Sequence, residues 1–188
     1  MDIANFKKDK KIFAFSDTHG MHRKLVIPEN TDILLCVGDA VEDNLDPADY
    51  QDFLDWFESQ PGKYKIFVPG NHELIFDVAP KFGELLFKDR NILLGNNRVI
   101  DCDGISFYCI MGGVIPDEGL ELMKQTDFFV THFPVEQLLP DVTIFPNALI
   151  FGHNHDLGSA VCINGPCFEY SVSKYELLNY EEDETYPE

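Results

Sequence analysis

Short apolar runs recur along the chain, and each is rich in β-branched and aromatic residues. Their lengths and their polar boundaries are typical of strands that are buried in a sheet. The predicted strands cover residues 11–16, 32–37, 64–68, 91–94, 105–111, 127–131, 148–151, 160–163 and 167–173. The last of them follows the pair Asn164-Gly165, which is typical of a hairpin turn.

A different periodicity between the second and third of these runs predicts an amphipathic helix over residues 47–60. Asp46 can cap its first turn, and Pro47 suits the first helical position. Apolar side chains recur at positions i, i+3, i+4 and i+7, namely Tyr50, Phe53, Leu54 and Phe57. We expect this face in the core, and weaker patterns predict helices over 80–89 and 117–125.

Strands and helices alternate in the first half of the chain, whereas strands dominate the second half. This order predicts an α/β fold with partly parallel sheets. We expect one domain over residues 1–188, because the length suits one domain and there is no internal repeat or linker. Residues 179–188 are predicted to form a solvated acidic tail.

Charge and composition exclude several classes of function. The formal net charge of −19 disfavours nucleic acid as a partner, because the chain repels phosphates at long range. No apolar stretch is long enough to span a membrane, and the first residues lack a signal peptide, so we expect no membrane association and a cytoplasmic location.

The five cysteines do not form a recognisable disulfide framework. Cys36, Cys102 and Cys109 lie in or beside apolar runs and are predicted to be core residues. Cys162 and Cys167 could form one bridge, but nothing in the sequence requires it.

Polar residues with metal-binding side chains follow five of the predicted strands. They are Asp17 and His19, Asp39, Asn71 and His72, His132, and His153 and His155. In α/β sheets the carboxyl ends of strands are where ligands bind, so these side chains are expected to converge. Of the six histidines only His22 falls outside the pattern, and it is predicted to be a surface loop residue.

Imidazole and carboxylate groups together suit Mn, Fe, Zn, Ni or Co. The seven candidate ligands are Asp17, His19, Asp39, Asn71, His132, His153 and His155, too many for one ion. Two ions that share Asp39 would use them all, because a carboxylate has two oxygens. Paired ions suit displacement at a phosphoryl group. For any single histidine, a partly buried structural role remains the simpler interpretation.

Five short blocks in this order resemble the signature of the calcineurin-like metallophosphoesterases. They are SDTHG (16–20), GD (38–39), GNHE (70–73), TH (131–132) and GHNH (152–155). Residues 52–77 are more narrowly similar to the small metallophosphodiesterase branch of that superfamily.

The resemblance implies a four-layer α-β-β-α sandwich with mixed sheets and a site that holds two divalent metal ions, with Mn favoured. Asp17, His19, Asp39 and His155 would hold one ion. Asp39, Asn71, His132 and His153 would hold the other. A hydroxide that bridges the two metals would attack phosphorus in line.

The resemblance also implies roles for residues around the metals. His72 would protonate the leaving oxygen, and Glu42 would orient His72. Asn71, His72 and Arg23 are candidates to contact the substrate, although a surface position is the plainer expectation for Arg23. Glu73 is expected either to support a ligand or to be a cap or surface acid.

One departure from the family pattern bears on the substrate. Many relatives carry an Arg that contacts phosphate where this chain has Asp43. An acid there would repel a monoester dianion more than a diester, so we predict a small phosphodiester, such as a cyclic nucleotide. The alternatives are a phosphomonoesterase or nucleotide pyrophosphatase, and a non-catalytic metal-binding scaffold. The segment 112–129 is short, so we expect a pocket that is open or is completed by a second subunit, as in a homo-oligomer.

Overall fold

The computed structural model describes residues 10–43, 45–134, 148–153 and 160–163, and only the backbone of the last range. The predicted strand over 167–173, the acidic tail over 179–188, His155 and Cys167 lie outside the described residues. No helix in the described ranges is both long and apolar enough to cross a membrane.

The first sheet contains four parallel strands in the order in which they occur in the chain. They are β1 (Ile12–Phe15), β2 (Ile33–Cys36), β3 (Tyr64–Phe67) and β4 (Leu93–Leu94). Because all four run the same way, their carboxyl ends lie at one edge of the sheet.

The second sheet is mixed, with three parallel strands between two antiparallel ones. Its strands are β5 (Arg98–Cys102), β6 (Ile105–Ile110), β7 (Phe128–Thr131), β8 (Ala148–Phe151) and β9 (Ala160–Ile163). The prediction of partly parallel sheets is confirmed. Strand β5 was not predicted, since its RVIDC sequence has only a short apolar core between charged residues.

In the part of the chain that the structure describes, four α-helices and one 3-10 helix connect the strands. They are the 3-10 helix η2 (His22–Lys24), α1 (Pro47–Ser59), α2 (Ile75–Val78), α3 (Pro80–Leu86) and α4 (Gly119–Gln125). The helix predicted over 47–60 is confirmed, and the Asp46 side chain accepts a hydrogen bond from the Ala48 backbone N–H. Its apolar face is buried as expected, and Trp56 is buried with it. The sequence did not predict η2 and α2, because each is only about one turn long.

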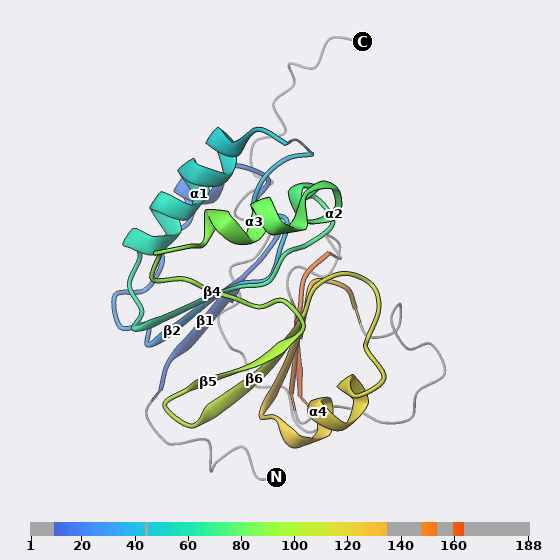
Figure 1. The fold of residues 1–188 in the computed structure, drawn as a ribbon. Helices are drawn as coiled ribbons and strands as arrows, with labels where there is room; N and C mark the ends of the chain where they lie inside the picture. Colours follow the sequence, from blue (N-terminus) through green and yellow to red (C-terminus); the bar gives the residue numbers. More distant parts are fainter. Residues whose placement is uncertain (1–9, 44, 135–147, 154–159, 164–188) are drawn as a thin grey trace, which may run out of the picture.

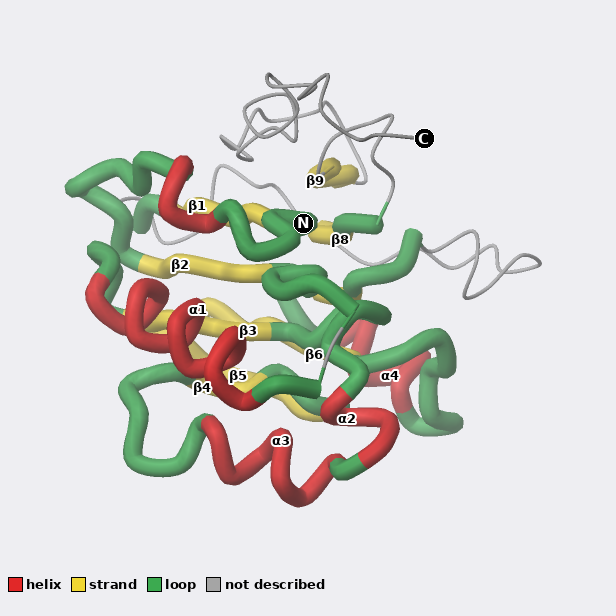
Figure 2. The backbone as a smooth tube through the Cα atoms, turned by 90° about the horizontal axis from the view of Figure 1, so that it is seen from above, coloured by secondary structure: helices red, strands yellow, loops and turns green. Residues whose placement is uncertain are grey.

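Strand alternation divides the interior into three hydrophobic clusters, and these define four layers (Figures 1 and 2). Leu34 and Cys36 of β2 pack with the residues of α1, whereas Ile33 and Leu35 pack against the second sheet. The far face of the second sheet packs against Met123 of α4. The predicted α-β-β-α sandwich is therefore confirmed.

Two smaller predictions can be checked in this core. Cys36, Cys102 and Cys109 are buried free thiols, as predicted. The prediction that His22 is a surface residue is wrong, because its side chain is only 3% exposed. Its ring packs on Phe53 and Trp56 of α1, 5.3 and 5.0 Å between ring centroids. The sequence did not reveal this contact, because η2 is too short to show a helical periodicity of apolar residues.

Candidate metal centre

The candidate ligands follow the carboxyl ends of strands in both sheets, and backbone hydrogen bonds tie the strand-end loops together. Asp17 N–H donates to Gly38 O, and His19 N–H donates to Asp39 O, so the loops after β1 and β2 are joined. Gly152 N–H donates to His132 O and joins the loops after β7 and β8. These bonds fix the polar side chains relative to one another.

Asp39 lies at the centre of the cluster and is 1% exposed. Its Oδ2 lies 3.0 Å from His132 Nε2 and 3.8 Å from His72 Nε2. Its Oδ1 accepts a hydrogen bond of 3.0 Å from the His72 backbone N–H. One carboxylate thus contacts groups from both sheets.

On one side of Asp39, two histidines and an amide converge. Asn71 Oδ1 lies 3.1 Å from His132 Nε2 and 2.9 Å from His153 Nδ1. Ligand atoms of Asp39, His132 and His153 all lie within 4.8 Å of one another, a spacing that one metal ion can bridge. Together with Asn71, these are the four residues that the family resemblance assigns to the second ion.

On the other side, ligand atoms of Asp17, His19 and Asp39 also lie within 4.8 Å of one another. The backbone N–H of His153 donates to both oxygens of Asp17, which links the two groups. Asp39 belongs to both groups, as the sequence predicts for a bridging ligand. His155, the fourth ligand predicted here, lies outside the described residues.

The two nitrogens of the His132 ring have different partners. Nδ1 lies 2.7 Å from Val37 O, so it carries a proton, and Nε2 faces Asp39. Burial opposes a charge on this ring, but the hydrogen bond and the charge of Asp39 outweigh it and raise the pKa of His132. Burial likewise opposes a charge on Asp39, whose pKa the His132 contact lowers. Each of the two groups thus favours the charged form of the other.

Metal affinity is expected to fall as the pH falls from 8 to 5. His132 must be unprotonated at Nε2 to bind a cation, and its raised pKa means that a proton competes at a higher pH than it would for an ordinary histidine. Below that pKa, each displaced proton lowers the affinity about tenfold per pH unit. Calorimetric titration of Mn²⁺ at several pH values measures this slope, and equal affinities at pH 5 and pH 8 would contradict a histidine-rich site.

Gly38 and Gly70 leave the space in which these side chains meet. A Cβ atom on Gly70 would collide with the carboxylate of Asp39 and lie 2.9 Å from Cγ of His132. A Cβ atom on Gly38 would lie 2.6 Å from His132 Nδ1. Such distances are too short for van der Waals contact, so the two glycines are required for the approach of Asp39 and His132.

Gly70→Ala is therefore expected to lower metal affinity by at least about tenfold, because it displaces Asp39 or His132 by a clash rather than by removing a ligand atom. Gly113→Ala is the matched control, since a Cβ atom there meets nothing within 4 Å. Metal titration of both variants measures the effect. Equal affinity in Gly70→Ala and Gly113→Ala would show that this packing does not hold the ligands.

Four candidate ligands have left-handed backbone conformations, with positive φ angles of 55° at Asp17, 43° at His19, 53° at Asp39 and 67° at His153. Strain of this kind costs about 1–3 kcal/mol per residue and is concentrated at functional sites. The backbone of this chain is thus held in unfavourable conformations at the positions whose side chains converge.

His72 faces the cluster from its rim and is 25% exposed at the side chain. Its Nε2 is the nitrogen near Asp39, and its Nδ1 lies 2.9 Å from Asp43 Oδ1. The family resemblance implied Glu42 as the carboxylate that orients His72, but in the structure Asp43 lies beside Nδ1 of that ring. Glu42 Oε2 lies instead 3.9 Å from His19 Nδ1. Two adjacent acids follow Val41, and only the path of the turn decides which of them reaches His72.

Glu73 supports the cluster from behind and is 1% exposed. Its carboxylate accepts hydrogen bonds from the backbone N–H groups of Gly70, Asp39 and Ala40, at 2.6, 2.9 and 2.8 Å. Burial, followed by the charge of Asp39, raises the pKa of Glu73. Of the two roles weighed from the sequence, the structure supports the first, because Glu73 fixes the loop that carries Asp39.

Arg23 does not join the cluster. It lies on η2, is exposed, and pairs through Nη2 with Asp52 of α1. Among the described residues its ion-pair partner is thus a helix carboxylate rather than a group at the strand ends.

The donor set itself fits a pair of divalent cations. Carboxylate oxygens, an amide oxygen and imidazole nitrogens form two groups that share Asp39, and glycines leave room between them. Comparison with known proteins agrees with this chemistry, since residues 10–157 match the calcineurin-like phosphoesterase family. The chain belongs to this family. The resemblance seen in the sequence is confirmed, and the family uses divalent metal ions.

Curated relatives are similar to parts of this calcineurin-like phosphoesterase chain. The human and mouse proteins named metallophosphoesterase domain-containing protein 1 are each 42% identical over 62 residues, which is 33% of this chain and 18% of theirs. A UPF0046 protein of Caenorhabditis elegans is 28% identical over 110 residues, 52% of this chain and 37% of the worm protein. The chain therefore spans less than two fifths of these relatives.

Among solved structures, one match is to a protein of unknown function from Aquifex aeolicus. It has a TM-score of 0.38 and 16% sequence identity, and the match covers 72% of this chain and 87% of the other.

Proposed function

We propose that the chain is a metal-dependent phosphoesterase that hydrolyses a small phosphodiester. The observation that carries the proposal is the pair of ligand groups that share the buried carboxylate of Asp39. Asp17, His19, Asp39 and His155 would hold one cation, and Asp39, Asn71, His132 and His153 the other. Manganese is the favoured ion, because mixed oxygen and nitrogen ligands suit it.

When bound, the two cations would supply Lewis acidity to the phosphoryl oxygens and activate the attacking water. The protein's own part is to position charge and protons. Val37 O fixes the His132 ring so that Nε2 faces Asp39, and Glu73 fixes the backbone of Asp39. The positions of His132 and Asp39 are thus set by second groups before the substrate arrives.

His72 is proposed to donate a proton to the leaving oxygen. Asp43 contacts its Nδ1, which leaves Nε2 directed to the side of Asp39, where the phosphoryl group would lie. Asp43 would hold the ring in this orientation, and its negative charge would stabilise the doubly protonated imidazolium, the form that can donate a proton from Nε2. Asn71, whose Oδ1 lies between two histidines, would approach the same phosphoryl group.

Asp43 also supports a diester rather than a monoester substrate. Its carboxylate lies 2.9 Å from His72 Nδ1, at the rim where the substrate would enter. A negative charge there disfavours the dianion of a monoester more than the single charge of a diester. Arg23 does not offset this charge, because its described ion pair is with Asp52.

The test is hydrolysis of bis(p-nitrophenyl) phosphate and p-nitrophenyl phosphate as Mn²⁺ is titrated into metal-free protein. We expect Mn²⁺-dependent turnover of both, with kcat/KM higher for the diester. Asp43→Asn is expected to bring the kcat/KM values of the diester and the monoester closer together. Faster turnover of the monoester would reverse the proposed preference, and absence of turnover of either substrate would favour a non-catalytic metal-binding scaffold.

A further inference from the structure

Two histidines and a carboxylate form a further group at the edge of the candidate metal centre. His19, Glu42 and His72 offer ligand atoms that all lie within 4.8 Å of one another, a spacing that one cation can bridge. These residues follow β1, β2 and β3, which are neighbouring strands of the first sheet. We call this group the rim site. It differs from the two groups that share Asp39, because neither of them contains Glu42 or His72.

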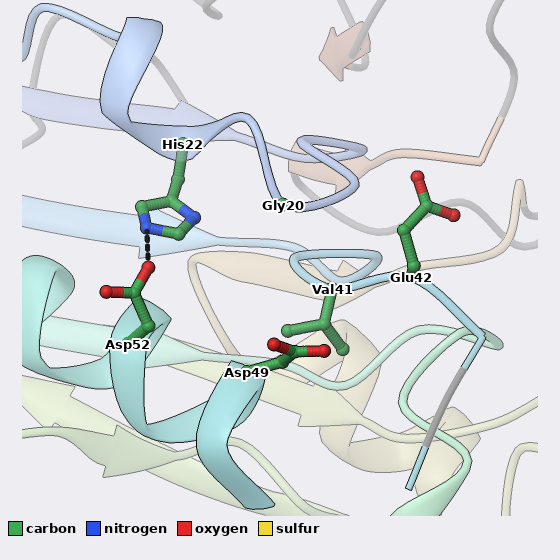
Figure 3. A pocket seen from close by; sticks show the side chains of 6 residues that line it. All are labelled: Gly20, His22, Val41, Glu42, Asp49 and Asp52. Atoms are coloured by element: carbon green, nitrogen blue, oxygen red, sulfur yellow. Dashed lines mark ion pairs between the residues drawn. The ribbon is translucent and has the colours of Figure 1, made fainter. Parts of the chain in front are cut away.

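The three side chains of the rim site approach one another closely. His19 Nδ1 lies 3.9 Å from Glu42 Oε2, and the rings of His19 and His72 meet edge to face with their centroids 4.6 Å apart. Figure 3 shows that Glu42 turns its carboxylate away from Asp49 and Asp52, which line a pocket beside α1 with it. The Glu42 carboxylate therefore belongs with the two histidines rather than with the acids of the helix.

Asp39 fixes the backbone of both histidines. The His19 N–H donates to Asp39 O, and the His72 N–H donates to Asp39 Oδ1. The side chains of His19, Glu42 and His72 are 12%, 66% and 25% exposed, so an ion can reach them from solvent. The two rings are thus positioned before a cation arrives, and mainly the exposed Glu42 side chain has to become ordered when it binds.

The donors of the rim site favour zinc over manganese. Two imidazoles and one carboxylate, with a water in the fourth position, form a donor set that Zn²⁺ uses in proteins. Mn²⁺ suits sets that are richer in carboxylate, carbonyl and water oxygens, and the rim site contains one carboxylate. The carboxylate of Asp43, 2.9 Å from His72 Nδ1, adds a further negative charge beside the site.

An ion in the rim site would act on two parts of the proposed mechanism. A His72 ring that binds a cation cannot also be doubly protonated, so it cannot donate a proton to the leaving oxygen. A neutral imidazole has one lone pair, so the same ion would draw His19 away from the cation that it holds with Asp17 and Asp39. Both effects lower the rate of hydrolysis.

We propose that the rim site binds an additional Zn²⁺ ion, which inhibits the phosphoesterase when zinc is in excess. The inference rests on the proposed function, because the inhibition acts through the proton donor and one metal ligand of that mechanism. Binding of the ion itself needs only His19, Glu42 and His72. Zinc would thus activate the chain at the two groups that share Asp39 and inhibit it at the rim site.

The first test counts bound zinc. Metal-free full-length protein is dialysed against increasing Zn²⁺, and the wild type is compared with Glu42→Gln and with Glu84→Gln, which makes the same change on the exposed surface of α3. We expect the third ion per chain to need at least about tenfold more zinc in Glu42→Gln than in the other two proteins, because the amide lacks the charge of the carboxylate. Identical binding curves for the three proteins overturn the inference.

The second test measures hydrolysis of bis(p-nitrophenyl) phosphate on the same samples. We expect the wild-type rate to rise as two ions bind and to fall at least about tenfold as the third binds, because the first ion is displaced when it loses His19. The ratio of the maximal rate to the rate at excess zinc should approach one in Glu42→Gln and keep the wild-type value in Glu84→Gln. A wild-type ratio in Glu42→Gln overturns the inference and leaves the proposed function intact.

If the diester is not hydrolysed at any zinc concentration, the proposed function fails by itself and the zinc count alone decides the inference. His72→Ala provides a second comparison, because it removes another ligand of the rim site. It should also need at least about tenfold more zinc for the third ion. A third ion that binds equally well without the Glu42 carboxylate or the His72 ring lies elsewhere on the chain and overturns the inference.

Discussion

Asp39→Asn is expected to bind less than one Mn²⁺ ion per chain and to lose diester hydrolysis by about a thousandfold or more. Asp39 belongs to both groups of candidate ligands, so one substitution weakens both ions. The amide that replaces the carboxylate has one oxygen and no negative charge, and therefore cannot bridge two cations. Elemental analysis after gel filtration, together with kcat on bis(p-nitrophenyl) phosphate, measures the two effects.

Asp77→Asn makes the same chemical change on the exposed surface of α2 and is expected to keep wild-type metal content and activity. Circular dichroism separates loss of metal from loss of fold, because Asp39 is buried and pairs with His132. A folded Asp39→Asn protein that still holds two ions per chain would refute the bridging role.

His72→Ala is expected to lower kcat by about a hundredfold to ten-thousandfold for a diester with an alkyl leaving group, the range typical of a general acid. The loss should be much smaller for p-nitrophenolate, which leaves without needing a proton. Metal content should be unchanged, because the seven ligands of the proposed centre do not include His72, although its ring lies within 4.8 Å of ligand atoms of His19 and Glu42. The comparison requires kcat of the wild type and His72→Ala for alkyl and p-nitrophenyl diesters under the same conditions.

Asp43→Asn should show the same dependence on the leaving group with a smaller loss, since Asp43 acts by positioning His72 through Nδ1. Glu42→Gln is the matched comparison, because Glu42 is the neighbouring acid and faces His19 instead. If His72→Ala lowered kcat equally for alkyl and p-nitrophenyl esters, His72 would not be the proton donor.

The strand-end rule predicted the candidate site because it needs no tertiary information. Each ligand that the structure describes follows a strand whose apolar run is plain in the sequence, as with Asp39 after β2 and His132 after β7. Parallel strands bring their carboxyl ends to one edge within each sheet, and the packing of the two sheets places Asp39 of the first beside His132 and His153 of the second.

Features set by single turns could not be predicted in the same way. The choice between Glu42 and Asp43 depends on the path of one loop, and the burial of His22 depends on how η2 packs on α1. The hydrogen bonds from three backbone N–H groups to Glu73 are equally invisible in a sequence, because their donors are not side chains. Strand β5 was not predicted, because its pairing with β6, and not its own sequence pattern, makes it a strand.

The central claim is that the strand ends hold two cations that make the chain a phosphodiesterase, and titration of metal-free protein tests it most directly. Bound Mn²⁺ and the rate of bis(p-nitrophenyl) phosphate hydrolysis are measured on the same samples. We predict no hydrolysis without metal and a rate that reaches its maximum as binding approaches two ions per chain. Full hydrolysis by the chelator-treated protein, or binding of two ions without any hydrolysis, would contradict the claim.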